Sequence, residues 1–116
     1  MAISKTEKRE LNRLLHEILR LRDRVCLKCG TDGTLQMSHI YPKGRYKGME
    51  YEPLNVKLLC YGCHFHFWHK NPIEAHAWLA SVMPKERLDY LKLRSQVVDS
   101  GMRNYKLLKI MLENEL

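Results

Sequence analysis

The chain has 116 residues, 45% of them hydrophobic and 28% charged, which excludes a disordered tail and fits one domain with a modest core. Its 20 Lys and Arg residues outnumber 13 Asp and Glu residues, and the net charge of +7 favours a polyanionic partner such as nucleic acid, although basic composition can also serve solubility alone. No apolar run approaches the roughly eighteen residues that a membrane span needs, so we expect no membrane segment.

The N-terminal segment predicts a long basic helix over residues 5–24. Ser4 and Glu7 form a capping-box signature. Apolar residues then recur at helical spacing, at Leu11, Leu14, Leu15, Ile18, Leu21 and Val25. The other faces carry Lys and Arg side chains, which either contact phosphate or form a solvated surface. The stretch MAISKTEKRE has no apolar run, so we expect no secretory signal and a cytoplasmic location with reduced cysteines.

The four cysteines are arranged as two C-x-x-C pairs with none left over: Cys26, Cys29, Cys60 and Cys63. A core this small tends to need a covalent or metal staple, and four cysteines can supply either two disulfides or one metal site. The paired spacing is typical of a Cys₄ zinc site. Because four thiolates leave zinc no open position for water, we expect this zinc to be structural.

The segment between and after the cysteine pairs predicts a strand, a loop, a second strand and a helix. Residues 26–33 have the glycines of a tight turn, and a strand is expected over 35–40. The stretch YPKGRYKGMEYEP is rich in Gly and Pro and predicts a loop. A second strand is expected over 55–59, and the absence of breakers after it predicts a helix over about 61–69.

The rest of the chain predicts a helical tail. Asn71 and Pro72 suit the start of a helix that runs to about residue 82, and Pro84 begins another that runs to about 98. A break at Asp99, Ser100 and Gly101 precedes a last helix within 102–116. Its apolar residues either form a dimer surface or, as we expect, pack on the core: Leu107, Leu108, Ile110, Met111 and Leu112. We therefore expect the protein to be a monomer or a weak dimer.

Three residues stand at fixed places in this strand, strand, helix order. His39 closes the first strand, Asn55 opens the second, and His64 directly follows Cys63. With the motifs CLKCG, SHI, EPLNVKLLC and CHFHFWH in that order, the segment at about 21–70 resembles the HNH, or ββα-metal, endonuclease family. The residues RLRDRVCLKCG and the tail after HKNPIEA are similar to phage-encoded HNH proteins of the recombination type.

This resemblance implies an α+β fold and a single domain over residues 1–116. A ββα-metal core at 26–70, held by the Cys₄ zinc, would be flanked by the helix at 5–24 and the helical tail at 71–116. It also implies a hydrolase that cuts DNA in a phage-infected or bacterial cell, in DNA processing, recombination or packaging, alongside other phage DNA-processing proteins.

The resemblance assigns a chemical role to each of the three residues. Phosphodiester hydrolysis needs an activated water, a cation beside the developing charge and a fixed geometry. His39 would be the general base, since a neutral imidazole accepts a proton near pH 7. His64 would bind the catalytic Mg²⁺ or Mn²⁺, and Asn55 would tie the loop to the strand that bears the base.

Two positions depart from the family pattern. Ser38 stands where many relatives have an Asp or His that also binds the catalytic ion, and Trp68 stands where some have a second helix histidine. We expect the ion to be held by His64 and waters, with His69 or Gln36 able to compensate. His16 and His76 are read as ordinary surface or core residues, and the role of His66 is open.

The loop between the strands supplies the candidate DNA contacts. Lys43, Arg45 and Lys47 could clamp the DNA backbone on either side of the cleaved bond, or be solvated charge. The alternative function is a non-catalytic, zinc-dependent nucleic-acid-binding module, which the departure at Ser38 favours. A zinc-dependent protein-interaction domain would leave the excess of Lys and Arg over Asp and Glu unexplained.

Overall fold

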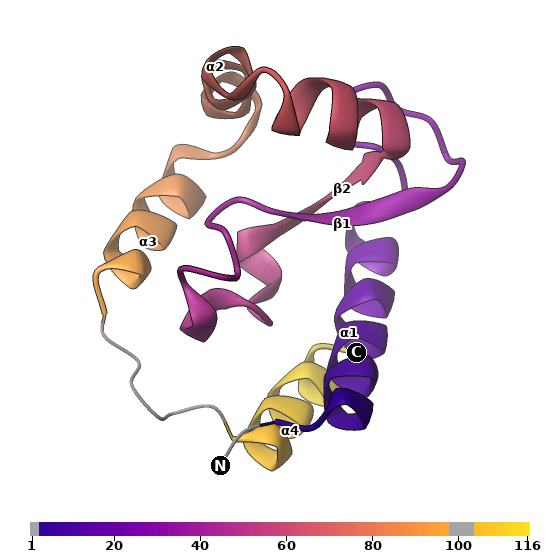
Figure 1. Cartoon of the computed structure of the whole chain (residues 1–116), viewed down its shortest axis with the longest axis vertical. Coiled ribbons are helices and arrows are strands. Elements are labelled where there is room, and N and C mark those ends of the chain that lie inside the picture. The colour runs from indigo at the N-terminus through magenta and orange to yellow at the C-terminus, as the bar shows by residue number, and fades with distance from the viewer. Residues whose placement is uncertain (1–2, 98–103) are drawn as a thin grey trace.

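The computed structural model describes residues 3–97 and 104–116, which form an α+β fold around a two-stranded antiparallel sheet (Figure 1). The described helices and strands are α1 (Lys5–Arg22), β1 (Leu35–His39), β2 (Val56–Cys60), the π-helix η3 (Gly62–His69), α2 (Pro72–Val82), α3 (Lys85–Ser95) and α4 (Tyr105–Glu115). Two short 3₁₀ turns, η1 (Lys47–Met49) and η2 (Pro53–Asn55), lie in the loop between the strands. The predicted α+β class is confirmed.

Helix α1 begins as the sequence predicts and ends two residues early. The backbone N–H of Ser4 donates to Glu7 Oε1 at 2.9 Å, and the N–H of Glu7 donates to Ser4 Oγ at 3.1 Å, which completes the capping box. The helix ends at Arg22 instead of residue 24 because Arg24 has a φ of +67°, which no α-helix accommodates.

The buried face of α1 differs from the predicted stripe in its last turn. Four of the predicted residues are buried, together with Leu19, whereas Leu21 is 63% exposed and Val25 is 37% exposed. Leu11, Leu15 and Ile18 follow an i, i+4, i+7 series whose next member is Arg22. The Arg22 guanidinium donates to the Pro53 and Val56 carbonyls, both at 2.8 Å, so a cation takes the place of the last apolar contact.

The sheet separates two apolar clusters. In the antiparallel register Leu35 pairs with Cys60 and His39 pairs with Val56. Val56 and Leu58 pack on the side of α1 and α4, while Leu59 packs with Trp68 of η3 and with α2. Figure 1 shows α4 beside α1, away from α2. With neighbours on both faces, β2 is almost fully buried.

The start of β2 is also held from α3. The Arg87 guanidinium donates to the Leu54 carbonyl at 2.8 Å and to the Val56 carbonyl at 3.0 Å, so two arginines from separate helices share one carbonyl. Burial lowers the pKa of Arg87 to about 10, and the charge of Arg22 acts in the same direction. The pair fixes η2, and with it Asn55, between α1 and α3.

The helix predicted over 61–69 is present, but it is wound as a π-helix over Gly62–His69. Its hydrogen bonds link residues five apart, so residues five apart in sequence lie one above the other. Trp68 of η3 packs in the core, where it is 7% exposed. The sequence pattern predicts a helix here but not its winding, since the run HFHFWH has no apolar period.

The tail forms helices close to the predicted bounds. Asn71 precedes α2, but its side chain donates to the His66 carbonyl at 3.2 Å instead of capping the helix. Helix α3 ends at Ser95, earlier than the predicted residue 98, and the predicted break at 99–101 lies outside the described residues. In α4, Leu112 is buried and Leu108 packs against the core, as expected, but the other three apolar residues expected there are about half exposed: Leu107, Ile110 and Met111. None of the described helices is both long and apolar enough to cross a bilayer.

Candidate functional site

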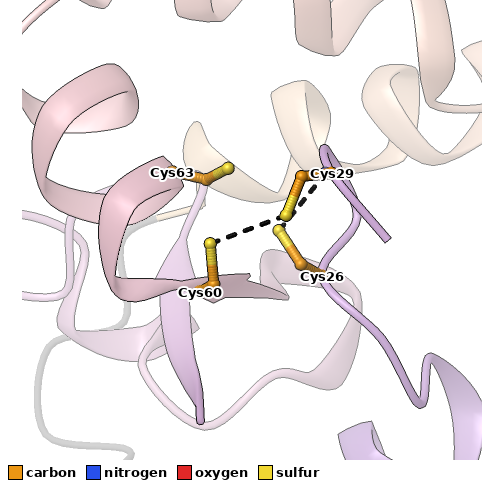
Figure 2. A group of neighbouring side chains, drawn as sticks. All are labelled: Cys26, Cys29, Cys60 and Cys63. Atoms are coloured by element: carbon orange, nitrogen blue, oxygen red, sulfur yellow. Dashed lines mark hydrogen bonds between the residues drawn. The ribbon is translucent and has the colours of Figure 1, made fainter. Parts of the chain in front are cut away.

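The four cysteines meet at one point, as Figure 2 shows. Their sulfur atoms all lie within 4.8 Å of one another, and the Sγ atoms of Cys29 and Cys60 are 3.7 Å apart. Four sulfurs bound tetrahedrally to zinc at about 2.3 Å would be about 3.8 Å apart. The cluster therefore has the donor set and the size of a structural zinc site.

The first cysteine pair lies on a tight turn that backbone hydrogen bonds fix in place. The N–H of Gly30 donates to the Cys26 carbonyl at 2.9 Å, and Gly30 has a φ of +79°, which glycine adopts without strain. The N–H of Leu27 donates to the Leu58 carbonyl at 3.0 Å, which joins the turn to β2. Cys60 ends β2 and Cys63 lies in the first turn of η3, so the cluster links three segments.

The pKa values of the thiol groups shift in opposite directions. Burial acts to raise the pKa of Cys26, but hydrogen bonds from the backbone of Cys29, Cys60 and Lys28 outweigh it and lower the pKa to about 6. Burial and the neighbouring Cys60 sulfur raise the pKa of Cys63. Four thiolates this close repel one another, so a divalent cation is the group that would let all of them ionise together.

His39 is the last residue of β1, and one of its ring nitrogens is hydrogen-bonded. Its Nε2 lies 2.8 Å from the Glu50 carbonyl oxygen, and because a carbonyl only accepts, Nε2 carries the hydrogen and Nδ1 is left with a lone pair. Burial lowers the pKa of His39 below its usual 6.5, and the charge of Lys43 acts in the same direction. The imidazole is therefore neutral at pH 7 and able to accept a proton.

Asn55 is fully buried and holds both ends of the loop between the strands. Its Nδ2 donates to the carbonyls of Tyr41 and Met49, each at 3.0 Å, while its Oδ1 accepts from the Tyr41 N–H at 2.9 Å. It lies at the end of η2, just before β2 instead of within it. The amide fixes the loop that follows His39.

His64 is held between Gln36 and His69. The Nδ1 of His64 lies 2.8 Å from Gln36 Oε1 and donates to it, which leaves Nε2 with a lone pair. That Nε2 lies 2.9 Å from Nε2 of His69. Burial lowers the pKa of His64 to about 4, and the charges of His69, Lys57 and His39 act in the same direction. Both residues named as able to compensate for Ser38 and Trp68 thus contact His64.

Ser38 and Trp68 enclose a lysine that the sequence analysis did not single out. Lys57 is 1% exposed, donates from Nζ to Ser38 Oγ at 2.9 Å, and holds Nζ 3.2 Å above the centre of the Trp68 ring. Burial lowers the pKa of Lys57 to about 6, with the charge of Arg87 acting in the same direction, while the indole face favours the charged form. The signal for it was a lone cation in the apolar run NVKLL.

The sheet register separates the candidate residues. Gln36, Ser38 and Lys57 share the face that η3 covers, while His39 pairs with Val56 at the end of the other face. Among the described residues no hydrogen bond joins His39 to His64, although the charge of His39 acts on His64. The loop cations Lys43, Arg45 and Lys47 are all exposed, and Arg45 lies 5.6 Å from the centre of the Tyr46 ring.

Replacing any one of the four cysteines with Ala should abolish zinc binding and unfold the chain, because the binding free energy of a structural zinc is part of the folding free energy. Elemental analysis and circular dichroism test this, with Tyr61→Ala as the control inside the same C-x-x-C pair, since Tyr61 is 55% exposed. Wild type and control should carry equimolar zinc. Folded protein without zinc would contradict the assignment.

Lys57→Met should become more stable relative to the wild type as the pH falls. A lysine whose pKa is about 6 when folded and 10.5 when unfolded takes up its proton only in the unfolded state between those values, so protonation favours unfolding. The stability difference should grow by up to about 1.4 kcal/mol per pH unit between pH 10 and pH 6 and level off below. Urea unfolding of both proteins measures it, and a difference that is constant across this window would mean that Trp68 keeps Lys57 charged.

Comparison with known proteins finds no match for this chain. No family model, no curated protein and no solved structure matches it. What the chain does is therefore inferred from its own residues: the four-cysteine cluster that could bind zinc, and His39 and His64, each of which has one ring nitrogen held by a hydrogen bond to an oxygen.

Proposed function

We propose that this chain is a metal-dependent DNA endonuclease of the HNH type that hydrolyses phosphodiester bonds. The observation that carries the proposal is the state of two neutral histidines. His39 has its Nε2 on a carbonyl and a lone pair on Nδ1. His64 has its Nδ1 on Gln36 and a lone pair on Nε2, which faces Nε2 of His69 at 2.9 Å. A general base and a metal ligand each need one such nitrogen with the other ring nitrogen anchored.

His39 is the proposed base. Its lone pair takes a proton from the attacking water as the oxygen of that water bonds to phosphorus and the bond from phosphorus to the 3′ oxygen breaks. The 3′ oxygen leaves as an alkoxide and takes a proton from solvent water. The products, as the family resemblance implies, are a 5′ phosphate and a 3′ hydroxyl. Asn55 acts by holding the loop, through its bonds to Tyr41 and Met49, so that the imidazole keeps one position.

His64 is the proposed ligand of the catalytic ion. A divalent ion bound there would stabilise the charge that develops on the phosphate and the leaving oxygen. Gln36 holds the imidazole by its far nitrogen, as the outer partners of metal-binding histidines do. The four cysteines would carry a separate, structural zinc.

DNA binding is assigned to the exposed loop cations and the net charge of +7. Lys43, Arg45 and Lys47 follow directly on the strand that ends in His39. Arginine makes bidentate contacts with phosphate, so Arg45 is the strongest candidate among them.

The second candidate is a zinc-dependent nucleic-acid-binding module without hydrolysis. The contact of Ser38 with Lys57 favours it, because a hydroxyl that accepts from a buried lysine offers no anionic ligand to a catalytic ion. Nicking of supercoiled plasmid with Mg²⁺ or Mn²⁺ separates the two, since only the endonuclease converts the plasmid.

His39→Ala should lower the nicking rate by about 10²- to 10⁴-fold, the usual contribution of a general base, with zinc content and DNA affinity unchanged. His16→Ala, on α1, is the matched control and should nick at the wild-type rate. The wild-type rate should rise with pH through a midpoint below 6.5, because burial lowers the pKa of His39. Full activity of His39→Ala would remove His39 from the mechanism.

Arg45→Ala should bind duplex DNA more weakly and with a smaller salt dependence. Each phosphate neutralised contributes about 0.9 to the slope of log Kd against log salt, so the slope should fall by about that amount. Lys85→Ala removes one positive charge from α3 and should leave the slope unchanged. Fluorescence anisotropy across a salt series measures both variants, and equal slopes for the two would place the DNA contact elsewhere.

A further inference from the structure

A patch of aromatic rings lies open to solvent at η3. Tyr61, just before the helix, is 55% exposed and Phe65 is 44% exposed, and their ring centroids lie 4.8 Å apart. The exposed imidazole of His66 extends the group, with its centroid 5.8 Å from that of Tyr61. Single exposed apolar residues are ordinary, but rings that contact one another and stay exposed form a binding surface. These three residues are called the aromatic patch below.

The backbone that carries the aromatic patch is fixed at both ends. Tyr61 lies between Cys60 and Cys63, whose sulfur atoms belong to the four-cysteine cluster. Further along the same helix, Trp68 is buried in the core. The rings are therefore presented on a rigid support, and binding a ligand would cost little ordering of the chain.

The aromatic patch adjoins the proposed ligand of the catalytic ion. The ring centroid of Phe65 lies 5.4 Å from that of His64 and 5.9 Å from that of His69. A planar group stacked on Phe65 would therefore lie beside the position where His64 is proposed to hold the ion. The patch and the proposed site share one surface.

The charges around the aromatic patch suit a polyanion. Residues 61–70 contain no Asp or Glu, and the exposed Lys70 follows the helix directly. Lys28, from the turn of the first cysteine pair, is also exposed, and its Nζ lies 4.4 Å from the centre of the Phe67 ring. Single-stranded nucleic acid binds to such a combination, because its bases stack on aromatic rings and its backbone follows the positive charge.

The chemistry of the rings favours unpaired bases over duplex. In a duplex the grooves present the edges of the bases, while the neighbouring bases of the stack cover their faces. Phe65 has no donor or acceptor with which to contact an edge. An unpaired base has a free face that any aromatic ring can cover, whatever the sequence.

We propose that the aromatic patch binds the bases of single-stranded DNA and leads that strand to His64. DNA with a single-stranded segment is thus the substrate class that this surface selects over continuous duplex. The catalytic meaning of the selection rests on the proposed endonuclease function, but the binding of the single strand does not.

Fluorescence anisotropy tests the proposal on the zinc-loaded full chain without Mg²⁺ or Mn²⁺, using a labelled single-stranded oligonucleotide and its duplex. The wild type should bind the single strand more tightly. Phe65→Ala should weaken single-strand binding by about 5- to 150-fold, the usual contribution of one base stacked on a ring, and leave duplex binding unchanged. The salt dependence should stay the same, because no phosphate contact is lost. Phe65→Trp, which restores a ring, should restore the binding.

Tyr90→Ala is the matched control, because Tyr90 is an aromatic residue of α3 with nearly the same exposure as Phe65, at 42%. It should bind both forms of DNA as the wild type does, and zinc content and circular dichroism check that each variant is folded. Tighter binding of duplex by the wild type, full single-strand affinity of Phe65→Ala, or equal weakening on both forms would overturn the proposal.

The same measurements separate this surface from the proposed function. Single-strand binding that depends on Phe65 in a chain that never nicks DNA would uphold the surface and reject the endonuclease. A chain that nicks DNA but whose Phe65→Ala variant keeps full single-strand affinity would uphold the endonuclease and reject the surface.

Discussion

The convergence of four cysteine sulfurs is the constraint on which the rest of this small fold depends. Cys29 and Cys60 are 31 residues apart in sequence, and their sulfur atoms are 3.7 Å apart. A two-stranded sheet is at best marginally stable alone, and a metal ion bound by these sulfurs would close the segment that carries both strands. Both strands, the loop and Asn55 all lie in the segment that the two cysteine pairs bound.

Three basic side chains hold β2 against its neighbours. Lys57 is buried against Trp68, and Arg22 and Arg87 both donate to the Val56 carbonyl. These side chains help to fix the strand and helix positions with hydrogen bonds to oxygen and with an aromatic face. Burial lowers the pKa of His64, and Lys57 acts on it in the same direction.

Local sequence signals predicted the helices and strands. The features that depend on contacts between distant elements could not be predicted from them. The capping box joins Ser4 and Glu7, three residues apart, so it follows from the local sequence. The cysteine cluster joins residues 31 apart, but its pairing was predictable because two C-x-x-C motifs together supply the four ligands that zinc prefers. The burial of Lys57 was not predictable, because it requires Ser38 and Trp68 to arrive from two other elements. The roles proposed for the histidines stay predictions, since proximity does not establish chemistry.

The π-helix changes how this segment should be compared with other sequences. Relative to an α-helix, η3 has one more residue in each turn of hydrogen bonds, which is the register change that a single inserted residue produces. Deleting one residue between His64 and His69 and rewinding the segment as an α-helix would leave the two rings on one face. A search pattern that demands a four-residue spacing would therefore pass over this pair, and an alignment needs a one-residue gap here to superpose equivalent side chains.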